Sequence, residues 1–268
     1  MPRVRTATGI TLGYEEVDEG GHTPIVFLHG VGSDKSVWRP QLDYFRGDRR
    51  AVAFDYPGYG DSDPAYEGMT RDDYGASVLA AMTELGIDSA HVCGLSLGGV
   101  VAIAMHAAWP ERIVSLVLAD TFADHPEGQA ICERGIAGSD NLRVMAESRV
   151  DLLLAQPADP AVRSEVVETM ARIDPAAYRI GAKAVWLADQ QDRARTIRVP
   201  TLVLCGSDDR ITPPVLSRAL ARLIPGAEYQ EIERCGHISN LERPEEFNAL
   251  VGAFVRGVDS RELRPVDG

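Results

Sequence analysis

Residues 91–119 constrain the fold of this chain more than any other segment. His91-Val-Cys-Gly is a strand-like run that leads directly into Leu95-Ser-Leu-Gly-Gly-Val, and a helix of small apolar residues is expected from Val100 to Ala108. Ile113 to Ala119 is then a strongly apolar strand, as is typical of a sheet covered on both faces. Strands that alternate with helices in this way indicate a mainly parallel sheet with crossover helices.

The rest of the chain continues this alternation, with one interruption. Residues 121 to about 197 are rich in Ala, Arg, Glu and Asp, have helical periodicity and contain no clear strand. We therefore expect an α/β core from residues 1–120 and 198–268, with a helical cap at 121–197 inserted over the sheet. The expected core strands are 11–16, 25–28, 51–55, 199–205 and 227–232, and the expected core helices are 71–86, 215–224 and one from about 244.

A candidate nucleophile lies in the turn between the strand at 91 and the helix at 100. Gly94-Leu-Ser-Leu-Gly98 matches the pattern of a nucleophile elbow, in which glycines relieve crowding around a strained serine. The turn presents Ser96 at a helix N-terminus, where backbone amides favour negative charge. The pattern alone also fits a glycine-rich turn, but its position between an apolar strand and an apolar helix favours a reactive Ser96.

A serine hydroxyl needs a base, and His237 is the best candidate. It follows the last expected strand and precedes the last helix, so it lies at the carboxyl edge of the sheet where sites of this architecture form. His29 is expected to hold its loop in shape. A structural or surface role is expected for the other histidines, which are His22, His91, His106 and His125.

The base needs an acid to orient it, and the turn after the strand at 201 offers two. Asp208 and Asp209 are adjacent, so their side chains point in opposite directions on an extended segment and only one can face His237. The chain order Ser, Asp, His is the one expected for this architecture. Asp120, at the end of the preceding strand, is a third candidate.

Hydrolysis of an acyl group also needs two donors for the developing oxyanion. One is the backbone amide of Leu97, directly after the nucleophile. The other is expected from His29-Gly-Val-Gly32, through the amide of Val31.

Composition narrows the range of partners. The net charge of −13 argues against nucleic acid, because phosphate binding depends on clustered Lys and Arg. The N-terminus lacks an apolar signal core and no segment approaches the length of a membrane span, so we expect a cytoplasmic protein without a membrane partner. The four cysteines form no metal-ligand spacing, and Cys93 and Cys205 are expected to be buried free thiols. No cofactor or metal is expected, and the expected partner is a small-molecule substrate.

These segments together resemble the α/β-hydrolase superfamily. The similarity rests on six segments, which are His29-Gly30, Asp55-Tyr-Pro-Gly-Tyr-Gly-Asp-Ser62, Gly94 to Gly99, Pro110-Glu-Arg-Ile113, Gly206 to Pro213 and Gly236-His237. The resemblance implies an eight-stranded, mainly parallel sheet flanked by helices. It also implies that the acid stands three residues after the glycine that ends its strand, and counting from Gly206 this selects Asp209.

Within that superfamily the chain looks most like the 3-oxoadipate enol-lactonases. The similar segments are Cys93-Gly-Leu-Ser-Leu-Gly-Gly, Ile173-Asp-Pro-Ala-Ala-Tyr178 and Gly236-His-Ile-Ser-Asn-Leu-Glu. The resemblance implies a serine hydrolase that cleaves a carboxylic ester or lactone through an acyl-enzyme. Three alternatives stay open: a C–C bond hydrolase of ring-cleavage products, a general carboxylesterase, and a non-catalytic ligand-binding member of the fold.

An acidic lactone would need a cation in a protein with excess negative charge. The expected cap contains six arginines that could supply it, namely Arg134, Arg143, Arg149, Arg163, Arg172 and Arg179. The sequence does not distinguish among them.

Overall fold

A computed structural model describes residues 2–18 and 20–262 of the chain. They form one eight-stranded sheet in the order β1-β2-β4-β3-β5-β6-β7-β8. β2 pairs antiparallel with both of its neighbours, β1 and β4, and the remaining neighbouring strands pair parallel. The strands are β1 (Arg3–Arg5), β2 (Thr11–Val17), β3 (His22–Leu28), β4 (Arg49–Phe54), β5 (Ala90–Leu95), β6 (Ile113–Ala119), β7 (Thr201–Gly206) and β8 (Glu228–Ile232). The expected mainly parallel, eight-stranded sheet is confirmed.

Helices cover both faces of this sheet and gather at one end of it. They are η1 (Lys35–Trp38), α1 (Arg39–Phe45), α2 (Arg71–Glu84), α3 (Leu97–Ala108), η2 (Pro110–Arg112), α4 (Gly128–Ala137), α5 (Leu142–Leu153), α6 (Pro160–Ala171), α7 (Pro175–Trp186), α8 (Gln191–Thr196), α9 (Pro214–Leu223), α10 (Ser239–Glu242) and α11 (Pro244–Glu262). None of the helices within the described ranges is long and apolar enough to cross a membrane.

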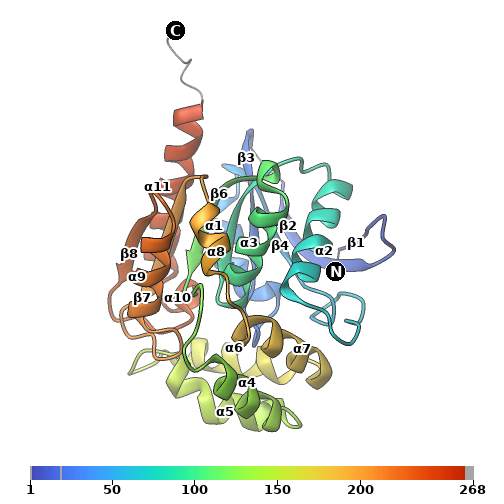
Figure 1. Ribbon diagram of the computed structural model, residues 1–268, viewed down its shortest axis with the longest axis vertical. Coiled ribbons are helices and arrows are strands. Elements are labelled where there is room, and N and C mark those ends of the chain that lie inside the picture. The colour runs from blue at the N-terminus through green and yellow to red at the C-terminus, as the bar shows by residue number, and fades with distance from the viewer. Residues whose placement is uncertain (1, 19, 263–268) are drawn as a thin grey trace.

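The expected helical insertion corresponds to the segment between β6 and β7. Figure 1 shows α4 to α7 grouped beneath the sheet, apart from the helices that flank its faces. α8 instead packs against α3 and α9. We keep residues 121–197 as the proposed cap, with α4 to α7 as its body.

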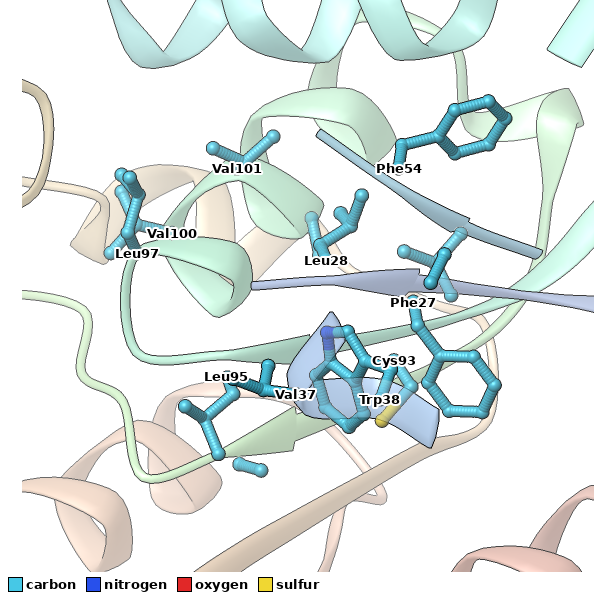
Figure 2. Packing of buried hydrophobic residues seen from close by; sticks show 14 of the residues in the cluster. Phe27, Leu28, Val37, Trp38, Phe54, Cys93, Leu95, Leu97, Val100 and Val101 are labelled. Atoms are coloured by element: carbon cyan, nitrogen blue, oxygen red, sulfur yellow. The ribbon is translucent and has the colours of Figure 1, made fainter. Parts of the chain in front are cut away.

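The core is built around the central strands β3, β4 and β5. Their apolar side chains are buried on both faces, and Figure 2 shows Phe27, Phe54 and Cys93 among the packed residues. The Trp38 ring from η1 stacks on Phe27 with 4.9 Å between centroids. Burying a side chain of this kind stabilises the fold by about 1.5–3 kcal/mol. The central strands are thus held firmly, and so are the loops at their carboxyl ends.

Candidate active site

Ser96 lies in a strained turn between β5 and α3. Its backbone angles are φ 56° and ψ −114°, in the left-handed region that a non-glycine residue rarely adopts. Its amide donates to the carbonyl of Ala119 at 2.9 Å, and its own carbonyl accepts from Thr121 Oγ1 at 2.8 Å. These bonds to the end of β6 hold the turn in its strained shape.

Glycines make the close approach around Ser96 possible. A Cβ at Gly94 would collide with the carbonyl of Gly98, and a Cβ at Gly98 would collide with the carbonyl of Leu28 in β3. Side chains at either position would push α3 away from the sheet. The serine is therefore held at the N-terminus of a buried helix, as the glycine pattern predicts.

His237 and Asp209 meet at the carboxyl edge of the sheet. His237 Nδ1 donates to Asp209 Oδ2 at 2.8 Å, and both side chains are almost fully buried. Asp208 is exposed, and its amide donates to the carbonyl of Cys235. Of the two neighbouring acids, the structure therefore brings Asp209 to the histidine.

Asp209 is held as a carboxylate by several donors. Its Oδ1 accepts from the amides of Ile211 and Thr212 at 2.7 and 2.9 Å, and its Oδ2 accepts from Thr212 Oγ1 at 2.7 Å. Burial would raise the pKa of Asp209, but the charge of His237 and these hydrogen bonds outweigh it and lower the pKa. Burial would likewise lower the pKa of His237, but the charge and hydrogen bond of Asp209 outweigh it and raise the pKa.

Asp120, the third candidate acid, has other partners. Its Oδ1 accepts from the amide of Gly206 at 2.8 Å, and its Oδ2 accepts from Ser239 Oγ. Burial, followed by repulsion from Asp209, raises the pKa of Asp120 to about 7. Asp120 thus joins β6 and β7 to the segment after His237 and makes no direct hydrogen bond to the imidazole.

Three ligand-type atoms lie together here. One oxygen of Asp120, the sulfur of Cys205 and one oxygen of Asp209 are within 4.8 Å of one another. The oxygens of both carboxylates already accept hydrogen bonds from protein donors, and burial raises the pKa of the Cys205 thiol well above its ordinary value. A metal ion would need a thiolate and carboxylates freed from these donors. The group therefore fits a hydrogen-bond network better than a metal site.

The loop after β3 brings Val31 to the same place. A Cβ at Gly30 would lie 3.5 Å from Ser96 Cβ, so this loop passes directly over the serine. Within the described ranges, the amides of Val31 and Leu97 donate no hydrogen bond to another residue. His29 is fully buried, its Nδ1 bonds the carbonyl of Gly30 at 2.8 Å, and its ring packs on Tyr56 and Tyr59. This agrees with the expectation that His29 holds the loop.

A cavity of about 360 Å³ opens beside these groups. Ser96, His237 and Val31 line it together, with side chains from α4, α5, α6 and α7 on the opposite side. Its volume suits a small organic molecule, since such sites measure roughly 300–1,000 Å³.

Sequence reasoning missed several residues of this cavity. His125, for which a structural or surface role is expected, lines the cavity and packs edge-on against Trp186 with 5.5 Å between ring centroids. Tyr178 and Trp186 also line it. Helical periodicity marks the buried face of each helix in 121–197, but it does not say which buried face is turned toward Ser96.

Comparison with known proteins places these features in a family. The profile of the "Alpha/beta hydrolase family" matches residues 25–250, which include Ser96, Asp209 and His237. The chain belongs to this family.

Two relatives of this alpha/beta hydrolase indicate the range of related enzymes. The "3-oxoadipate enol-lactonase 1" of Acinetobacter baylyi is 26% identical over 87% of this chain and 89% of its own. The "2-hydroxy-6-oxononadienedioate/2-hydroxy-6-oxononatrienedioate hydrolase" of Burkholderia vietnamiensis is 28% identical over 94% of this chain and 93% of its own.

Among solved structures, the enol-lactonase from Burkholderia xenovorans LB400 has the same fold. It superposes with a TM-score of 0.88 at 29% identity, and the match covers 95% of this chain and all of the enol-lactonase chain.

Proposed function

We propose that this alpha/beta hydrolase cleaves a carboxylic ester or lactone through an acyl-enzyme formed on Ser96. The observation that carries the proposal is that Ser96 and His237 line the same cavity while Asp209 binds the histidine from behind. The distance from His237 Nδ1 to Asp209 Oδ2 is 2.8 Å, which leaves Nε2 as the nitrogen that can accept the serine proton. Nucleophile, base and orienting acid are the three groups that acyl transfer by a serine requires.

In the first half of the proposed reaction, Ser96 Oγ attacks the carbonyl carbon and its proton passes to His237 Nε2. Asp209 keeps the Nδ1–H tautomer and stabilises the imidazolium that forms. The amides of Val31 and Leu97 donate to the oxyanion of the tetrahedral intermediate. The intermediate collapses, the C–O bond breaks, and His237 returns the proton to the leaving oxygen.

In the second half, water takes the place of Ser96 as the nucleophile and attacks the acyl-enzyme. His237 removes a proton from water, the hydroxide attacks the acyl carbon, and Ser96 leaves with the proton returned by His237. In a lactone the leaving oxygen stays attached to the acyl group, so the product is a single ring-opened acid. For an enol-lactone the released enol then rearranges to a ketone.

The substrate we propose is a small enol-lactone of the 3-oxoadipate type, with broader activity on short esters. Similarity to the enol-lactonases at 26% and 29% identity supports it, together with the size of the cavity. The Burkholderia vietnamiensis relative supports a second candidate, hydrolysis of a C–C bond in a ring-cleavage product, by the same triad.

Turnover of three substrates separates these functions. We expect rapid hydrolysis of p-nitrophenyl acetate and 3-oxoadipate enol-lactone and slow cleavage of a 2-hydroxy-6-oxo-dienoate ring-cleavage product. Ser96→Ala should lower kcat on the first two by at least about 10⁴-fold, as loss of a triad nucleophile does. Ser260→Ala, on the exposed face of α11, is the matched control. Preference for the dienoate would favour the C–C hydrolase, and no turnover of any substrate would reject the proposal.

A further inference from the structure

The cavity beside Ser96 is positively charged in a protein that is negative as a whole. It is lined by three arginines, which are Arg134, Arg149 and Arg210. Among the described lining residues, Glu127 is the one acid. The chain carries a net charge of −13, so a cluster of arginines without matching acids is unusual here. Such a cluster attracts an anionic ligand, since opposite charge in a narrow cleft focuses the field.

Most arginines of the α4–α7 region already have carboxylate partners. The pairs are Arg143 with Glu168, Arg163 with Asp151, Arg172 with Asp34, and Arg179 with Asp140. Within residues 2–18 and 20–262, Arg134 and Arg149 form no ion pair. Of the six arginines in this region, these two line the cavity. The absence of an ion pair within these residues therefore distinguishes Arg134 and Arg149 from the other four candidate arginines.

Arg210 differs from these two because its guanidinium is already used. Its Nη2 donates to the carbonyls of Leu154, at 2.8 Å, and Asp151, at the end of α5. These bonds fasten the turn that carries Asp209 to α5. Arg210 thus contributes charge to the cavity but has fewer free donors.

Arg149 has a neutral neighbour that can assist it. Its Nη1 donates to the hydroxyl oxygen of Tyr178 at 3.3 Å, and Tyr178 is 2% exposed. Burial raises the pKa of Tyr178 although the charge of Arg149 works in the opposite direction. The phenol therefore keeps its proton, which is available to an acceptor in the cavity.

We propose that Arg134 and Arg149, from α4 and α5, form a subsite for a carboxylate group of the substrate. This rests on the proposed function, which places the scissile carbonyl at Ser96. The substrate class is then a half-ester or lactone of a short dicarboxylic acid, with its free carboxylate turned toward the helices. A planar guanidinium offers two parallel donors to a carboxylate, and the apolar remainder of the cavity accommodates the carbon chain.

Two esters with one leaving group test this proposal. Mono-p-nitrophenyl glutarate carries the free carboxylate, and p-nitrophenyl 5-methylhexanoate replaces it with an isopropyl group of similar size. We expect a higher kcat/KM for the glutarate. In Arg134→Gln and Arg149→Gln the ratio of the two kcat/KM values should fall about 10- to 100-fold, mostly through KM, as expected for loss of a charged hydrogen bond. Arg143→Gln, whose partner Glu168 is on the surface, should leave the ratio unchanged.

The outcomes distinguish the subsite from the acyl chemistry. Ser96-dependent hydrolysis of both esters with no preference for the glutarate, or a preference that survives both substitutions, would overturn the subsite and leave the hydrolase intact. If neither ester is cleaved, the proposed function fails, and calorimetric titration with adipate still tests the subsite. Binding of adipate by the wild type and its loss in the double variant would support the subsite, whereas no binding by the wild type would overturn it.

Discussion

At the scale of single residues, the proposed chemistry depends on which of two adjacent carboxylates, Asp208 or Asp209, faces His237. Asp209 is buried and receives four hydrogen bonds, one of them from the imidazole. Its neighbour Asp208 points to solvent. The alternation of side chains along an extended segment allows one of the pair to reach His237, but it does not say which one.

Exchange of the two carboxylates for amides tests the assignment of the acid. Asp209→Asn should lower kcat by about 10⁴-fold, because an amide can hold the imidazole in the wrong tautomer. Asp208→Asn should change kcat little, since its side chain is exposed. Steady-state rates on p-nitrophenyl acetate measure both. If Asp208→Asn were the more damaging substitution, our account of this turn would be wrong.

The pH dependence of the rate reports on the base. His237 must be neutral to accept the proton of Ser96, so kcat/KM on a neutral ester should rise with pH. Because the charge of Asp209 raises the pKa of His237, the midpoint should lie above the ordinary histidine value of about 6.5. Rates from pH 5 to 8.5, with folding checked by circular dichroism, measure this midpoint. A flat profile would remove His237 from the role of base.

At the scale of elements, the loop after β3 is fixed by a buried ion pair. Lys35 Nζ lies 2.7 Å from Asp55 Oδ2 and 2.6 Å from Asp61 Oδ2, and the Lys35 side chain is 4% exposed. The amide of Lys35 also donates to Asp55 Oδ1 at 2.8 Å. These contacts anchor η1 to the end of β4, and with it the loop that carries Val31.

Removal of this lysine should loosen the loop. Lys35→Met leaves Asp55 buried without its cation, which should lower the free energy of unfolding by about 3–5 kcal/mol. Arg39→Met is the matched control, because Arg39 pairs with Glu15 on the surface and such pairs contribute about 1 kcal/mol or less. Urea denaturation compares the two variants. Equal losses of stability would contradict an anchoring role for Lys35.

Long apolar elements could be predicted from the sequence, and short polar ones could not. β6 has a continuous apolar run and lies at its expected residues. α3 ends at Ala108 as expected but begins at Leu97, three residues before the expected start at Val100. η1 and α10 span four residues each and could not be predicted, because a single helical turn carries no periodicity. The burial of Lys35 could not be predicted either, because lysine is almost never fully buried unless it is paired, and its partners Asp55 and Asp61 are distant in the sequence.

At the scale of the whole molecule, the sheet collects the site from distant parts of the chain. Ser96, Asp209 and His237 follow β5, β7 and β8, and the loop of Val31 follows β3. Parallel strands bring these ends to one edge, which is why chain order and strand assignment could predict Ser96, His237 and an acid at 208–209. The choice of Asp209 over Asp208 came from the family resemblance. Side chains from the α4–α7 group line the cavity on its other side. Which arginines of that group have no carboxylate partner depends on tertiary packing, so the sequence left all six open.

Covalent labelling of the intact protein tests the central claim most directly. A fluorophosphonate reacts with a serine only where base and oxyanion donors activate it. We expect the mass of the wild-type protein to increase by one phosphonyl group, located on the peptide that contains Ser96, and no increase for His237→Ala. Labelling of a different serine, or no labelling of folded wild-type protein, would contradict the account.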